Sequence, residues 1–151
     1  MKNFKTAALA ASALLVSSGA FAAINPDAVH LALDSLLVSS SKASVMNAIK
    51  AHGKPPATNA EARLGAPSTM TTTEISGIVV NKGGVLNVHL APVTGTDNGL
   101  VQYIPTVITT KKGKQAVEFR CISPNIPDIA KIAQNCAYQP SAQPAGNSGK
   151  K

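Results

Sequence analysis

The sequence predicts an α+β domain in which a long N-terminal helix packs on a four-stranded antiparallel meander followed by a C-terminal disulfide loop. Three observations support this fold class. Residues 27–52 carry an apolar stripe without Gly or Pro, residues 74–121 hold four β-rich segments separated by turn residues, and two cysteines, Cys121 and Cys136, lie near the C-terminus. A helix with one apolar stripe and a sheet with one apolar face bury both surfaces by packing together.

The first 22 residues have the pattern of a secretory signal peptide. Lys2 and Lys5 give a positive start, an apolar run covers residues 7–16, and Ala20-Phe21-Ala22 is a small-x-small cleavage site. The run is well short of the roughly 20 apolar residues that span a bilayer as a helix. We therefore expect cleavage after Ala22 rather than a retained anchor. The mature chain is expected in the periplasm or outside a bacterial cell, without a transmembrane anchor.

Removal of the leader leaves 129 of the 151 residues, enough for one domain, here residues 23–138. The mature chain keeps 12 basic and 7 acidic residues, a net charge of +5. This excess favours contact with anionic surfaces such as lipopolysaccharide or nucleic acid, but it specifies none of them.

The predicted helix has clear start and stop signals. Asn25 is a suitable N-cap, Pro26 suits the first helical position, and Gly53 followed by two prolines ends the helix. A helix over residues 26–52 would be about 40 Å long. The stripe is expected to face the sheet, although a part that extends beyond the sheet would be free to bind a partner helix. It consists of Val29, Leu33, Leu36, Leu37, Val45, Met46 and Ile49.

The remaining elements follow from turn residues and period-two alternation. Residues 54–73 are mostly loop. Residues 74–80 and 85–90 form a hairpin, residues 100–110 form a third strand that Pro105 bends or places at an edge, and residues 115–121 form the fourth. A helical turn is expected near residues 128–133. Residues 139–151, rich in Pro, Ser, Gly and Lys, are expected to be a disordered tail.

The two cysteines are expected to form a disulfide, because both follow the export signal. Closing a loop of about 15 residues stabilises a fold by roughly 3 kcal/mol in the chain-entropy model. The alternative is a metal or redox pair, but neither a C-x-x-C spacing nor a nearby histidine supports it.

Several segments resemble type IV pilins. AIKAHGKPP at residues 48–56 with NAEA at 59–62 is similar to the end of the pilin spine helix and the loop that follows it. Residues 73–80 and 83–90 resemble the first two pilin strands, and AVEFRC at 116–121 with residues 129–136 resembles the last strand and the disulfide-bounded region. The resemblance covers about residues 28–137.

The chain departs from the pilin pattern at its N-terminus. Pilins have a glycine at the leader-peptidase site, a Glu five residues later and about 20 apolar residues. Here the apolar run precedes Gly19, and Ile24 stands where the pilin pattern has the Glu. The resemblance therefore implies a soluble pilin-like head. It also implies a non-enzymatic protein that contacts a pilus or envelope protein in pilus assembly, adhesion or fibre regulation.

Residues that commonly carry chemistry are scattered. His30, His52 and His89 have no metal-ligand spacing and no nucleophile motif accompanies the serines, so we expect no enzyme, metal or cofactor. The segment at 94–99 is interpreted as a plain turn rather than a calcium loop. The lysines of two predicted turns are either solvated or contact an anion, which gives an alternative function as a secreted module for DNA or lipopolysaccharide. These lysines are Lys82, Lys111, Lys112 and Lys114.

Overall fold

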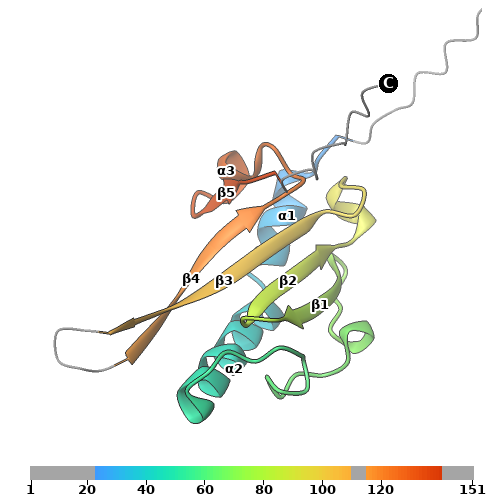
Figure 1. Ribbon diagram of the computed structural model, residues 1–151. Helices are drawn as coiled ribbons and strands as arrows, with labels where there is room; N and C mark the ends of the chain where they lie inside the picture. The colour runs from blue at the N-terminus through green and yellow to red at the C-terminus, as the bar shows by residue number, and fades with distance from the viewer. Residues whose placement is uncertain (1–22, 110–114, 141–151) are drawn as a thin grey trace, which may run out of the picture.

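The computed structural model describes residues 23–109 and 115–140 (Figure 1). The predicted signal peptide and residues 141–151 of the predicted tail lie outside this part of the chain. Across residues 23–109 and 115–140, every helix is too short or too polar to span a lipid bilayer.

The predicted helix is divided in two. Helix α1 spans Pro26–Leu33, with the Asn25 side chain accepting a hydrogen bond from the Ala28 N–H at 3.2 Å. Helix α2 spans Leu36–His52 and ends at Gly53, which has a left-handed φ of 66°. The break occurs because Ser35 adopts an extended conformation and caps α2, its hydroxyl accepting from the Val38 N–H at 3.2 Å. The prediction of one continuous helix was therefore wrong.

The break also changes which residues face the sheet. Leu36, predicted in the buried stripe, is 83% exposed because the helix restarts there in a new direction. The buried residues of α2 are Val38, Ser41, Val45, Ala48 and Ile49.

The sheet has five strands in the order β1-β2-β3-β4-β5. The first four are antiparallel neighbours and correspond to the predicted strands; they are β1 Ile75–Asn81, β2 Val85–Leu90, β3 Leu100–Thr109 and β4 Gln115–Ser123. The fifth, β5 Cys136–Tyr138, pairs in parallel with the end of β4.

The fold class predicted from the sequence, a long helix on a four-stranded antiparallel meander, is thus contradicted: the sheet is five-stranded and mixed. The short helix α3, Ile129–Ile132, returns the chain so that β5 runs beside β4 in the same direction. Three residues are too few to show a strand period. Beyond β5, the Gln139 N–H donates to the Ser123 carbonyl at 2.9 Å, so this first residue of the predicted tail continues the pairing.

Both main helices lie on one face of the sheet and form the core with it. Buried Ile78, Val88 and Val101 of the strands lie in one cluster with Val29 of α1 and Val45 of α2. Short 3₁₀ turns, η1 Pro67–Thr69 and η2 Pro92–Thr94, complete the fold. Figure 1 shows β3 and β4 extending as a long ribbon beyond β2 and β5.

Candidate functional site

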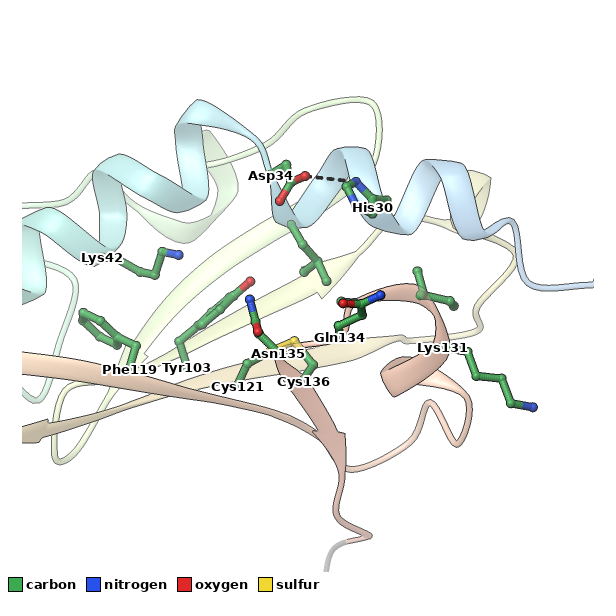
Figure 2. Close-up of a pocket in the computed structure, with 13 residues that line it drawn as sticks. His30, Asp34, Lys42, Tyr103, Phe119, Cys121, Lys131, Gln134, Asn135 and Cys136 are labelled. Atoms are coloured by element: carbon green, nitrogen blue, oxygen red, sulfur yellow. Dashed lines mark ion pairs between the residues drawn. A yellow bond between two sulfur atoms is a disulfide. The ribbon is translucent and has the colours of Figure 1, made fainter.

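A cleft of about 650 Å³ lies between helices α1 and α2 on one side and strands β3, β4 and β5 on the other (Figure 2). Its upper wall comes from α1 and α2, and its lower wall from the two long strands and the disulfide loop. The lining residues are His30, Leu33, Asp34, Lys42, Tyr103, Phe119, Cys121, Lys131, Ile132, Ala133, Gln134, Asn135 and Cys136.

The helix break shapes the upper wall of the cleft. Asp34 caps the C-terminus of α1, and its carboxylate lies 2.9 Å from Nδ1 of His30 one turn earlier. Both side chains are more than half exposed, so the pair contributes little to stability. The ion pair places a carboxylate and an imidazole at the mouth of the cleft.

Tyr103 forms the centre of the cleft. It projects from β3, is 7% exposed, and directs its hydroxyl toward the helices (Figure 2). Burial, and next the negative charge of Asp34, raise the pKa of the Tyr103 hydroxyl to about 12. The phenol is therefore neutral at physiological pH and is able to donate a hydrogen bond.

Lys42 places a positive charge next to this ring. Its Nζ lies 4.7 Å from the centre of the Tyr103 ring, within the distance of a cation–π contact. The cleft thus combines the carboxyl group of Asp34, the amino group of Lys42 and the aromatic ring of Tyr103.

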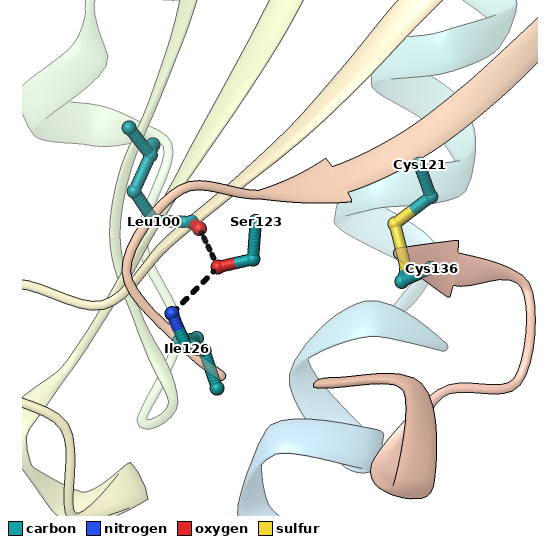
Figure 3. Close-up of a disulfide and its surroundings, with 5 residues drawn as sticks. All are labelled: Leu100, Cys121, Ser123, Ile126 and Cys136. Atoms are coloured by element: carbon teal, nitrogen blue, oxygen red, sulfur yellow. Dashed lines mark hydrogen bonds between the residues drawn. A yellow bond between two sulfur atoms is a disulfide. The ribbon is translucent and has the colours of Figure 1, made fainter. Parts of the chain in front are cut away.

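The disulfide forms the far wall of the cleft. Cys121 of β4 and Cys136 of β5 are bonded, with Cα atoms 4.4 Å apart, which confirms the predicted disulfide (Figure 3). Ser123 fixes the start of the loop between them: its hydroxyl donates to the Leu100 carbonyl at 2.7 Å and accepts from the Ile126 N–H at 3.1 Å (Figure 3). The loop that carries Gln134 and Asn135 is therefore tied to β3 at one end and to β4 at the other.

These groups suit binding by hydrogen bonds, charge and aromatic contact. Both cysteines of the chain are bonded, which removes thiol chemistry. Within residues 23–109 and 115–140, no group of three or more His, Cys, Asp or Glu side chains is arranged to hold a metal ion.

The lysines predicted to contact an anion are only partly described. Lys82 is exposed in the turn between β1 and β2, which is closed by the Gly84 N–H donating to the Asn81 carbonyl at 3.0 Å. Lys111, Lys112 and Lys114 lie outside the described residues. An anion site formed by these four lysines remains a prediction from the sequence.

The three histidines and the segment at 94–99, considered in the sequence as metal sites, lie in different parts of the structure. His30 lies at the cleft, whereas His52 is exposed at the end of α2 and His89 pairs with Leu100 on the opposite face of the sheet. In the segment at 94–99, the hydroxyls of Thr94 and Thr96 lie 2.7 Å apart and are buried, so they bond to each other within the turn.

Sequence reasoning missed Asp34, Lys42 and Tyr103 as site residues. They come from the end of one helix, the middle of another and a strand, and only the packing of these elements brings them together. Searches against protein-family models and against curated proteins find no match for this chain.

Proposed function

We propose that this chain is an exported, non-enzymatic, pilin-like protein that acts by binding another protein of the cell envelope or of a fibre. The observation that carries the proposal is the cleft, which offers Tyr103 and Phe119 beside Asp34 and Lys42. Aromatic residues are enriched at protein-binding surfaces, and polar groups surround them at the rim. The leader pattern at residues 1–22 supports export, and a disulfide is compatible with an oxidising compartment.

The first test addresses export. Mass spectrometry of the mature protein should find an N-terminus at Ala23. A methylated N-terminus at Ala20 would instead indicate processing as a prepilin and would overturn the exported soluble form.

The second test addresses the cleft. Mature protein fixed to a support should retain an envelope protein, and Lys42→Glu should reduce the retained amount at least tenfold. Lys50→Glu is the matched control, because this substitution makes the same charge change on the same helix. Lys50 does not line the cleft. Equal retention by the two variants would contradict the proposal. Retention of DNA or lipopolysaccharide that weakens as salt rises would favour the anion-binding alternative.

A further inference from the structure

The two edges of the sheet differ in how far their backbone groups are hydrogen-bonded. At the β1 edge, the Asn59 side chain occupies the backbone groups: its Nδ2 donates to the Ile78 carbonyl at 2.9 Å, and its Oδ1 accepts from the Val80 N–H at 2.6 Å. A third bond, from Nδ2 to the Gly65 carbonyl at 2.9 Å, holds the loop in place. This edge is closed to a further strand.

The β4 edge is open over most of its length. Strand β5 pairs with β4 only at residues 121–123, whereas β4 continues back to Gln115. In the described ranges, no strand and no loop backbone bonds to the outer side of residues 115–120. Alternate residues of an antiparallel strand direct their N–H and C=O groups away from the paired neighbour. Among residues 23–109 and 115–140, the outward backbone donors and acceptors of residues 115–120 therefore find no backbone partner.

The strands at this edge form a two-stranded ribbon. Strand β2 pairs with β3 only through residues 100–103. Within the described part of the chain, residues 104–109 of β3 and 115–120 of β4 therefore have only each other as strand partners (Figure 1). Two strands alone are marginally stable in water and gain from a third. On the β3 side, Pro105 has no N–H to offer and packs against the turn at Gly84. A third strand is therefore accommodated on the β4 side.

Side chains on the open strand define what would pair with it. Val117 and Phe119 are half-buried on the cleft face, and Phe119 lines the cleft itself. Glu118 and Arg120 are exposed on the opposite face. The edge is thus continuous with the cleft and carries one charge of each sign, two residues apart.

Charge opposes pairing with a second copy of the chain in one register. The antiparallel register that pairs residues 116–120 with the same residues of a copy, clear of β5, places Glu118 directly opposite Glu118. Like charges in directly opposite positions are destabilising, whereas opposite charges there are favourable.

We infer that residues 115–120 of β4 bind an extended segment of another protein as an added antiparallel strand. The segment carries a basic residue opposite Glu118, an acidic residue opposite Arg120 and an apolar residue between them that faces Phe119. Antiparallel pairing is favoured because it is slightly more stable per residue than parallel pairing. The inference deepens the proposed function and rests on it for the partner being a protein.

The test uses the mature chain and two capped nine-residue peptides of alternating Thr and Val. One has Asp-Val-Lys at its centre, in the order that antiparallel pairing requires, and the other has Lys-Val-Asp. We expect the first to bind at least about fivefold more tightly, since two cross-strand ion pairs replace two like-charge pairs. It should slow amide exchange at residues 115–120 and leave residues 75–81 of β1 unchanged, because Asn59 occupies that edge.

A charge-swapped chain, Glu118→Arg with Arg120→Glu, keeps the net charge and should reverse the peptide preference. Equal binding of both peptides, or unchanged amide exchange at residues 115–120, would overturn the inference. So would protection of these amides that rises with protein concentration in the absence of peptide, since the occupant would then be a second copy. If the charge swap reverses the peptide preference but retention of an envelope protein does not depend on Lys42, the proposed function alone fails. If capture depends on Lys42 but residues 115–120 stay unprotected, the added strand alone fails.

Discussion

The Asn59 side chain acts as a substitute for a neighbouring strand. Its amide bonds to three backbone groups, two of them on β1, and the residue is 9% exposed. An amide group suits this position because it has a donor and an acceptor in the same relative arrangement as a peptide unit. The sequence predicted only a loop over residues 54–73, with no sign that Asn59 covers a strand edge.

Asn59→Ala should lower the free energy of unfolding by about 2–3 kcal/mol, because it leaves buried backbone groups of Ile78 and Val80 unpaired. Urea denaturation measures the change. Asn47→Ala is the control, since Asn47 is exposed on α2 and alanine favours the helix. Similar losses for both variants would show that the Asn59 bonds contribute nothing particular.

The raised pKa of Tyr103 should make the free energy of unfolding depend on pH in the alkaline range. Its folded-state pKa is about 12, whereas a tyrosine in the unfolded chain ionises near pH 10. Below about pH 10 both states are protonated and stability is full. Between about pH 10 and 12 only the unfolded chain ionises, so stability falls, by roughly 2–3 kcal/mol in total.

Absorbance at 295 nm measures this titration directly. In Tyr138→Phe, Tyr103 is the only tyrosine, and its midpoint should lie near 12 in the folded protein. Asp34→Asn should move the midpoint down, because it removes the nearby negative charge. A midpoint close to that of the urea-unfolded chain would contradict the buried position of the ring.

At the scale of elements, Ser35 decides where the second helix begins. Ser35→Ala removes the bond to the Val38 N–H and should cost about 1 kcal/mol of stability. Ser39→Ala, at an exposed position inside the same helix, should be neutral or slightly stabilising. Thermal unfolding followed by circular dichroism distinguishes the two, and equal midpoints would mean that the cap is not formed.

The disulfide holds the parallel strand in place. Replacing both cysteines, with Cys121→Ser and Cys136→Ser, should lower the free energy of unfolding by about 3 kcal/mol, because the bond closes a loop of 15 residues. Amide exchange should quicken first at residues 136–139, which depend on pairing with the end of β4. Equal quickening in β1 and β2 would show instead that the whole sheet loosens as one unit.

At the scale of the whole molecule, the start of the domain is fastened to a distant turn. The Asn25 N–H donates to the Thr94 carbonyl at 2.8 Å, and a Cβ added at Gly95 would overlap the Ala23 carbonyl. Gly95 also has a φ of 71°, which favours glycine. The segment that precedes α1 is thereby packed against η2, about 70 residues further along the chain.

Gly95→Ala should therefore destabilise the protein by at least about 1 kcal/mol more than Gly83→Ala, because overlap adds to the backbone cost. Gly83 is the matched control: it has a φ of 85° but open space around it. Chemical denaturation of the two variants gives the difference. Equal losses would mean that residues 23–25 are not packed against this turn.

The sequence by itself determined the local elements and the covalent link. The N-cap at Asn25, the stop at Gly53, the four hairpin-connected strands and the pairing of Cys121 with Cys136 all depend on nearby residues or on a lone pair of thiols. Capping, turn geometry and apolar alternation act over a few residues, so they are visible in the chain itself.

Only the tertiary structure decided the helix break, the parallel strand and the cleft. Asp34 and Ser35 interrupt a stripe that continues on both sides, so the angle between α1 and α2 depends on how each packs against the sheet. The three-residue strand β5 forms because the disulfide and α3 deliver it to β4, which no local preference specifies. Tyr103, Lys42 and Asp34 meet for the same reason: contacts between residues far apart in sequence exist only once the layers have packed.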